Sequence, residues 1–440
     1  MDKKLIFETL ELAKKSGVQD ARVVGNKGKS SSITIFNGEL EKICESTSAS
    51  LTIELFKDNK HGKVSTNKMD LPTIDYIIKR GCESLELIEE DTYYRLPDKE
   101  LYFKGKEIDL EQFDQKYHDI EAEQKKQLAI KEAAFALQDD KIIANCTDYE
   151  DNMIHSIMAD TNGFIGESSN TYYALSSECT LQGEGHLRSQ GWWSEMDIFF
   201  GDEIEGIGTY SNTLGAAYSR AVTMLAPKKI PSGRYPVVIE NGCASKVLSP
   251  IFSALNGGAI YQRNSFLLDS LGKEIFPNKL TIVDKPRTKK AIGARLFDNE
   301  GIATKNMSII DKGVVSTYFI NTYYAGKLNT SPTVDSCSVP TIAPLGDKDK
   351  IAMIQSLGTG VLITGFNGGN HNPSTGDFSF GIEGFFFKNG EICHPIKEMN
   401  MTGNIISLWA DILHIGEDLR PYTMWRTPSL SFANVNLSGV

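Results

Sequence analysis

The sequence lacks the features of a membrane or secreted protein. It has no run of about 18 apolar residues, the length that a helix needs to cross a bilayer. The first segment, Met1 to Gly17, is charged along its length and has neither the apolar core nor the small-residue cleavage site of a signal peptide. The seven cysteines are scattered and form no CxxC pair, which fits free thiols in a reducing compartment. We therefore expect a soluble, cytoplasmic protein without contact to a membrane.

An excess of positive charge is also missing. The chain has 46 Lys and Arg against 57 Asp and Glu, a formal net charge of −11. No stretch holds more than two consecutive Lys or Arg residues. Proteins that bind DNA regardless of its sequence neutralise phosphates with clustered Lys and Arg side chains. The charge therefore argues against direct nucleic-acid binding.

The sequence contains none of the common catalytic motifs that we sought. There is no GxSxG nucleophile elbow and no GxxxxGK[ST] phosphate loop. The seven histidines lie far apart and none belongs to an HExxH pair. Cys393 and His394 are adjacent, so in a strand they would face opposite sides and could not share a metal. The segment Gly360 to Gly369 lacks the GxGxxG pattern, and the turn Asn367 to His371 favours a structural role.

Hydrophobic periodicity predicts an α+β fold whose N-terminal α/β region contains an antiparallel meander and helices. Helices are expected over Lys3 to Ser16 and from Asp70 onward, where Asp70 caps the first turn. Alternating segments and the Asn37-Gly38 turn predict a hairpin and two more strands between these helices. The expected strands are Ser32 to Phe36, Leu40 to Cys44, Ser48 to Phe56 and about Lys63 to Thr66.

A polar connector, Asp91 to Lys106, separates this meander from a second region. A long charged helix is predicted over Leu110 to Leu137 and another helix over Ile204 to Leu225. Gly183 to Phe200 indicates a long hairpin or an adaptable loop, and its Trp192-Trp193 pair is either a binding platform or an oligomer contact. The strands expected in this region are Lys141 to Asn145, His155 to Ala159 and Tyr172 to Gln182.

Breakers at Ala226 to Gly233 indicate the main domain boundary. We expect an N-terminal domain over 1–226, with sub-regions of about 1–90 and 107–226, and a mixed β-rich C-terminal domain over 231–440. The second domain begins with a buried strand, Pro236 to Ile239, followed by a helix that ends at Gly257-Gly258. Its inward positions are Ala244, Val247, Leu248, Ile251, Phe252 and Leu255.

The rest of the C-terminal region is expected to be mainly strands and loops. Strands are predicted at Leu280 to Val283, Ile309 to Ile310 and Val314 to Ile320, and a long Pro/Ser/Thr-rich loop at Asn329 to Lys350. The later elements are a helix at Ile351 to Leu357, strands at Gly360 to Gly365, Phe378 to Phe387 and Glu391 to Glu398, and a helix at Asn404 to Leu413.

Four polar residues are candidates for a peptide cleft or an interface. Arg263 and Asp269 follow the glycine pair and could form a buried ion pair or a peptide clamp, with a structural salt bridge as the favoured interpretation. His371 and Asp377 lie in and after a glycine-rich loop and would be the residues of an alternative, non-zinc active site.

Three segments resemble a known family. The runs YPVVIENG, NGGAIYQRNSFLLDSLGKEI and TGDFSFGIEGFFFKNGEICHPIKEMNMTGN are similar to the TldD/TldE (PmbA) family, and specifically to its TldE, or PmbA, branch. The resemblance covers most of the chain. Members of that family form cytosolic metallopeptidase complexes that trim extended or unfolded peptides, and the resemblance implies such a complex for this chain. The family also carries the name modulator of DNA gyrase. In the TldD branch, the helix after the entry strand carries HExxxH, and a later Cys supplies a third zinc ligand.

This chain departs from the TldD pattern at the zinc motif. Ser249 and Ala254 stand where the two His residues would fall, and Pro250 replaces the Glu general base. Neither Ser nor Ala offers competent zinc ligation, and Pro cannot move a proton. No Cys follows Cys393. We therefore expect no catalytic residue, metal ligand or cofactor in this chain, and zinc in its partner subunit.

The resemblance thus implies a non-catalytic subunit that forms a heterodimer with a TldD-like zinc subunit, or a homodimer when isolated, and helps to enclose a peptide substrate. Peptide capture by β-strand addition is expected, since backbone pairing tolerates varied sequences. Two alternatives stay open: an independently active hydrolase using His371 with Asp377, and a non-proteolytic regulatory protein linked to DNA gyrase.

Overall fold

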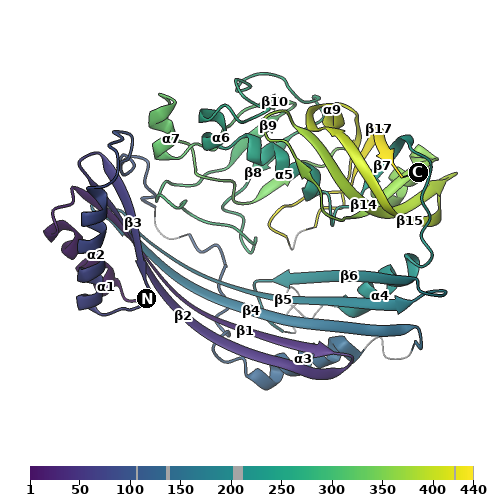
Figure 1. Ribbon diagram of the computed structural model, residues 1–440, viewed down its shortest axis with the longest axis horizontal. Coiled ribbons are helices and arrows are strands. Elements are labelled where there is room, and N and C mark those ends of the chain that lie inside the picture. Colours follow the sequence, from purple (N-terminus) through teal and green to yellow (C-terminus); the bar gives the residue numbers. More distant parts are fainter. Residues whose placement is uncertain (106–107, 135–138, 202–211, 421–422, 440) are drawn as a thin grey trace.

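The N-terminal half is built on one long antiparallel sheet. The computed structural model describes the chain except for residues 106–107, 135–138, 202–211, 421–422 and 440 (Figure 1). The sheet has the order β3-β2-β1-β4-β5-β6. Its strands are β1 (Asp20–Phe36), β2 (Glu39–Lys57), β3 (Lys60–Thr66), β4 (Ile142–Asp160), β5 (Ile165–Gln182) and β6 (Arg188–Asp197).

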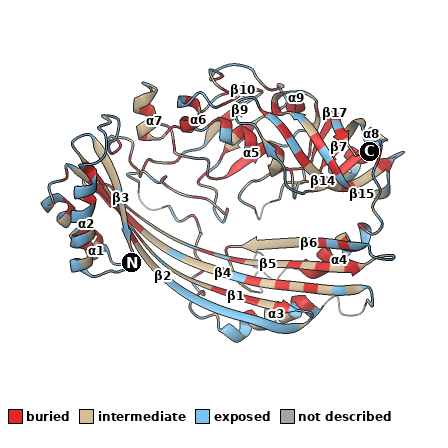
Figure 2. Cartoon of the chain, viewed as in Figure 1, coloured by how far each residue is buried: buried red, intermediate tan, exposed pale blue. Residues whose placement is uncertain are grey.

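These strands are much longer than the hydrophobic pattern predicts, and the prediction of separate short strands is wrong. β2 unites Leu40 to Cys44 with Ser48 to Phe56, and β4 unites the two strands expected at its ends. Residues 39–48 of β2 are all exposed (Figure 2), so no apolar alternation marks them. In β4 the buried residues include Thr147 and Asp151. Backbone pairing with β1 holds both segments in the sheet although their side chains carry no hydrophobic signal.

Four helices pack against one face of this sheet, while the other face turns toward the C-terminal half (Figure 1). The helix α1 (Lys3–Lys15) confirms the first predicted helix, and α2 (Leu71–Leu85) begins after Asp70, whose side chain accepts a hydrogen bond from the Thr73 N–H. Both pack near β3. At the opposite end lie α3 (Ala122–Ala133) and α4 (Thr213–Thr223).

The long helix predicted over Leu110 to Leu137 is wrong in its first part. Residues 110–121 are not helical, and residues 135–138 lie outside the described part. Asp114 and Tyr117 instead bind groups beneath the sheet. The Asp114 carboxylate accepts hydrogen bonds from the Tyr173 hydroxyl and the Phe200 N–H, and the Tyr117 hydroxyl donates to Asp151. Side-chain pairing with the sheet thus outweighs helix propensity here. Of the helix predicted over Ile204 to Leu225, residues 204–211 are likewise outside the described part.

The C-terminal half contains a small barrel. Five strands follow one another in the order β12 (Gly360–Phe366), β7 (Gly233–Ile239), β17 (Leu430–Ser438), β15 (Glu391–Asn404) and β14 (Asp377–Lys388). Because β14 also pairs with β12, these strands close into a ring. The short strands β13 (Asn370–His371) and β16 (Ile412–Ile415) pair with β14 and β17. The whole chain is therefore mixed α+β, as the sequence predicts.

A second, four-stranded sheet lies beside the barrel. Its order is β10 (Val314–Val315), β9 (Met307–Asp311), β8 (Ile282–Asp284) and β11 (Pro340–Ile342). The strand predicted over Val314 to Ile320 is thus only two residues long, and β11 lies within the segment expected to be a loop. The remaining helices are α5 (Ser245–Ala254), α6 (Gly257–Tyr261), α7 (Thr322–Lys327), α8 (Lys350–Leu357) and α9 (Ile405–Ala410).

The helix after the entry strand β7 differs in detail from its prediction. Gly257-Gly258 begins α6 rather than ending α5, because the Asn256 side chain accepts the Gly258 N–H and caps a new helix. α5 runs through Pro250 in one piece. Its inward face is confirmed, since Val247, Leu248, Ile251 and their neighbours belong to the main core. No described helix combines the length and apolarity needed to span a membrane.

Candidate functional site

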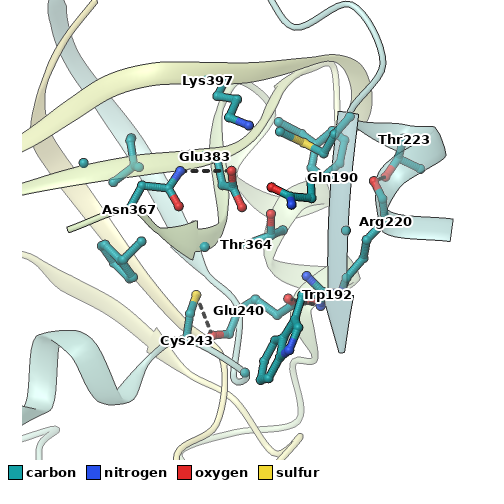
Figure 3. Close-up of a pocket in the computed structure, with 18 of the residues that line it drawn as sticks. Gln190, Trp192, Arg220, Thr223, Glu240, Cys243, Thr364, Asn367, Glu383 and Lys397 are labelled. Atoms are coloured by element: carbon teal, nitrogen blue, oxygen red, sulfur yellow. Dashed lines mark hydrogen bonds and ion pairs between the residues drawn. The ribbon is translucent and has the colours of Figure 1, made fainter. Parts of the chain in front are cut away.

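A large cavity of about 880 Å³ lies between the two halves of the chain (Figure 3). We call it the large cavity. One wall comes from β6 and α4, and the other comes from the barrel and the loop after β7. The barrel wall combines apolar and polar side chains, and there the Asn367 side-chain N–H donates to a Glu383 carboxylate oxygen at 3.0 Å. Other polar residues that line the cavity are Gln190, Thr364, Asn367, Glu383 and Lys397.

The strand β6 is the outer strand of the six-stranded sheet and borders this cavity. Alternate residues of an edge strand direct their N–H and C=O groups away from the sheet. The Ser194 carbonyl accepts a hydrogen bond from Arg420 of the C-terminal half at 3.1 Å, so the edge can be reached by donors from outside the sheet. Trp192 lines the cavity with its side chain 57% exposed. The edge thus combines backbone groups with an accessible aromatic side chain.

Trp193 is held between two arginines. The guanidinium carbons of Arg220 and Arg420 each lie 4.5 Å from its ring centroid. The Trp193 indole N–H donates to Glu195 at 3.3 Å. The neighbouring Gly191 lets α4 approach β6 closely, since a Cβ there would lie 2.1 Å from the Ala217 carbonyl oxygen. Cation–π contacts with both halves therefore make Trp193 a fixed part of the wall, whereas Trp192 remains accessible.

Glu240 forms the charged floor of the large cavity. Its carboxylate lies 2.5 Å from the Arg220 guanidinium of α4 and 2.5 Å from the Lys350 ammonium at the start of α8. Burial alone would raise the pKa of Glu240, but Arg220 and Lys350 bring that pKa below its ordinary value. The carboxylate therefore stays charged and joins the two halves of the chain.

Cys243 also lines the large cavity but is not suited to act as a nucleophile. Its Sγ contacts the carbonyl oxygens of Glu240 at 3.4 Å and Ile363 at 3.6 Å. Burial, followed by the charge of Glu240, raises the pKa of the Cys243 thiol. A reactive cysteine needs a thiolate at neutral pH, so this thiol fits a structural role.

The positions that correspond to the zinc motif do not fit a metal. Ser249 is exposed, whereas Pro250 and Ala254 are buried in the core, Ala254 with 1% exposure. Ser249 and Ala254 therefore face different directions on α5, and neither carries the nitrogen, thiolate or carboxylate group that binds zinc. Moreover, no three His, Cys, Asp or Glu side chains gather to hold a metal ion among the residues that the structure describes. We derive no zinc-dependent step in this chain.

The structure keeps the four predicted candidates outside the large cavity. Arg263 and Asp269 are both exposed and have positive φ angles, so the buried ion pair considered for them does not form. His371 is half-buried in β13, and burial followed by the charge of Lys246 lowers its pKa. Asp377 is exposed and binds Thr375 and Asn404 rather than His371, within the described residues.

The charged residues of the large cavity were not predicted. Arg220, Glu240 and Arg420 are separated by 20 and 180 positions, and only tertiary contacts bring them together. Of these three residues, Glu240 could have been identified as a site residue from the sequence. It directly follows the β-branched run of β7, and polar residues at strand ends often line binding sites. Trp192, for which the sequence leaves a binding platform and an oligomer contact open, lines the large cavity.

Comparisons with known proteins agree with this architecture. The chain matches family models described as PmbA/TldA metallopeptidase domain 1 over residues 21–85, central domain over 116–225 and C-terminal domain over 232–439. It is 26% identical over 443 residues to the metalloprotease PmbA of Escherichia coli O157:H7, covering 99% of this chain and 95% of that one.

Two solved structures extend the comparison. A protein from Bacteroides thetaiotaomicron, described as a modulator of DNA gyrase, is 39% identical and superposes with a TM-score of 0.94, covering 100% of this chain and 99% of that one. TldE from Thermococcus kodakarensis shares the fold, with a TM-score of 0.84 at 14% identity, covering 99% of this chain and 100% of that one. The domain models and the Bacteroides relative confirm the resemblance seen in the sequence, and the chain belongs to the PmbA/TldD metallopeptidase family.

Proposed function

We propose that this chain is the non-catalytic, TldE-like subunit of a cytoplasmic two-chain peptidase. The observation that carries the proposal is helix α5, which follows the entry strand and presents Ser249 and Ala254 in place of two His ligands and Pro250 in place of the Glu general base. A family member without these ligands is expected to leave hydrolysis to a partner that has them. The partner would be a TldD-like subunit with zinc.

The proposed role of this chain is to hold an extended peptide. The peptide would lie in the large cavity and pair with the free edge of β6, where the backbone groups accept any sequence. Trp192 would contact its side chains, since the indole is accessible and borders this edge. Glu240 is ion-paired with both Arg220 and Lys350, and these paired groups would keep the cavity walls in place rather than bind substrate.

The contact with the partner is assigned to the C-terminal half. Arg263, Asp269, His371 and Asp377 lie there outside the large cavity, and three of them are exposed, as a partner contact would require. We keep these residues as interface candidates. The isolated chain would form a homodimer through the same surface.

The test compares the purified chain alone with the chain coexpressed with a TldD-like subunit that carries HExxxH. Zinc is measured by elemental analysis, and cleavage is followed with an unstructured peptide. We expect less than stoichiometric zinc and no turnover for the chain alone, and turnover for the complex. Stoichiometric zinc together with cleavage by the isolated chain would overturn the proposal.

A pair of variants makes this test sharper. Replacing the motif Glu of the partner by Gln should abolish turnover while leaving the complex intact by size-exclusion chromatography. In this chain, Trp192→Ala should raise the KM for the peptide about tenfold with little change in kcat, because it removes binding that does not depend on the transition state. If turnover continues with the inactivated partner, catalysis belongs to this chain.

A further inference from the structure

A second cavity of about 530 Å³ adjoins the large one beside helix α5. We call it the small cavity. The two cavities share a wall formed by Gly242, Cys243, Phe366 and Arg420. Ser249, the first position of the replaced zinc motif, lines the small cavity. The small cavity therefore lies where a peptide leaving the large cavity would meet α5.

The charged side chains that line the small cavity are all positive. Lys246 and Arg420 line it, and no Asp or Glu does among the described residues. Within the described part of the chain, neither cation has a carboxylate at ion-pair distance, although Glu195 and Glu240 act on Arg420 from farther away. Arg220 in the large cavity, by contrast, is paired with Glu240. Two cations without a direct carboxylate partner among the described residues, at one cavity of an acidic chain, indicate a site for an anion.

Both cations are held in position by the protein. The Arg420 guanidinium donates to the Ser194 carbonyl at 3.1 Å and stacks on Trp193. It also packs against Gly242, where a Cβ would lie 3.3 Å from its Nη1. Because arginine carries five N–H groups, donors remain for a ligand. The Lys246 ammonium lies 4.8 Å from the Phe380 ring centroid. Positioned cations lose less conformational entropy on binding than mobile ones.

The remaining lining adds a hydroxyl and an apolar wall. Ser249 is three residues after Lys246, so both lie on the same face of α5. Its side chain is exposed toward the cavity. The apolar lining consists of Phe366, Met424 and Trp425, and the Trp425 ring packs 4.9 Å from that of Phe252. A ligand for this site would carry an anionic group next to an apolar one.

We propose that the small cavity binds the C-terminal carboxylate of a peptide whose last side chain is apolar. The carboxylate would pair with Lys246 and Arg420 and accept a hydrogen bond from Ser249, and the side chain would pack on Phe366, Met424 and Trp425. This inference rests on the proposed function, because it takes the occupant of the large cavity to be a peptide. The substrates would be peptides with a free C-terminus, and the subunit that holds this C-terminus would not be the one that cleaves the peptide.

The experiment measures peptide binding by the full-length isolated chain. Fluorescein-labelled Ala-Ala-Ala-Ala-Phe is prepared with a free carboxylate and, as its control, with a C-terminal carboxamide, and binding is followed by fluorescence polarisation. We expect the carboxylate peptide to bind about tenfold more tightly, corresponding to one charge-assisted contact. Lys246→Gln should remove this preference without weakening the carboxamide peptide, and Arg420→Gln, which also removes a contact with Trp193, should weaken the carboxylate peptide more than the carboxamide peptide. Lys388→Gln, an exposed position on β14, should retain it.

The inference would be overturned by equal binding of the two peptides, by no binding of the carboxylate peptide, or by a preference that survives both substitutions. If the Lys246 and Arg420 variants weaken both peptides equally, their role is structural and the inference also fails. Thermal unfolding of each variant shows whether the variant has lost its fold. Ser249→Ala, at an exposed position, gives a second test, and we expect it to reduce the preference for the carboxylate peptide threefold to fivefold. None of these results depends on zinc or a partner, so they are separate from the test of the proposed function.

Discussion

Replacing Glu240 by Gln should show how strongly one buried carboxylate joins the two halves of the protein. Glu240 is 6% exposed and lies 2.5 Å from both Arg220 and Lys350. Its replacement leaves two cations without their counter-charge. Breaking a buried ion pair in this way costs about 3–5 kcal/mol. Because the Arg220 and Lys350 side chains keep 27% and 32% exposure, water offsets part of this cost, and we expect a loss of about 2–3 kcal/mol.

Urea unfolding followed by tryptophan fluorescence and circular dichroism measures this loss. The matched control is Glu398→Gln, since the Glu398 carboxylate is 3.6 Å from Lys229 and its side chain is 78% exposed. An exposed ion pair contributes little, so this control should change the free energy of unfolding by less than about 0.5 kcal/mol. A loss below about 1 kcal/mol for Glu240→Gln would refute the assignment of Glu240 as a buried link.

The pH dependence of the same variant gives an independent check. The net effect of its surroundings is to lower the pKa of Glu240 from its ordinary value of 4.5. A carboxyl whose pKa is lower in the folded state stabilises the fold above its unfolded pKa and loses that effect as pH falls through the folded pKa. The difference between the wild type and Glu240→Gln should therefore be constant near neutral pH and shrink below about pH 4.5. A difference that persists unchanged to pH 3 would contradict the pKa direction.

Two further substitutions test the geometry of the cavity walls. Gly191→Ala should lower the free energy of unfolding by about 1–3 kcal/mol in the same urea assay, because its Cβ would lie 2.1 Å from the Ala217 carbonyl oxygen and 2.5 Å from the Ala221 nitrogen. Gly233→Ala, where the nearest atom is at 3.5 Å, is its control and should stay within about 0.5 kcal/mol. On α5, Ser249→His should be tolerated within about 0.5 kcal/mol, while Ala254→His should cost about 1–3 kcal/mol because Ala254 is 1% exposed. Equal tolerance at the two α5 positions would show that they do not face different directions.

Elements that bury an apolar face could be predicted from the sequence, whereas elements that bury polar groups or no side chains could not. The inward face of α5 and the helices α1 and α2 were predicted because apolar residues recur there with helical spacing. The full length of β2 and β4 was not predictable from hydrophobicity. One half of β2 buries no side chains, and β4 turns polar residues inward, where hydrogen bonds satisfy them. The first part of the predicted long helix failed for a related reason, since Asp114 and Tyr117 bind the sheet.

The sequence by itself determined the family and showed that α5 lacks the ligands and the general base of the zinc motif. Ser249, Pro250 and Ala254 have no metal-binding groups in any conformation, so this conclusion needs no coordinates. Only the tertiary structure decided where a ligand could lie. The charges of Glu240 and Arg220, and the cationic pair Lys246 and Arg420, come from segments far apart in the chain. Side-chain pairing across such distances depends on how the sheet and the barrel pack together, and local sequence patterns carry no information about that packing.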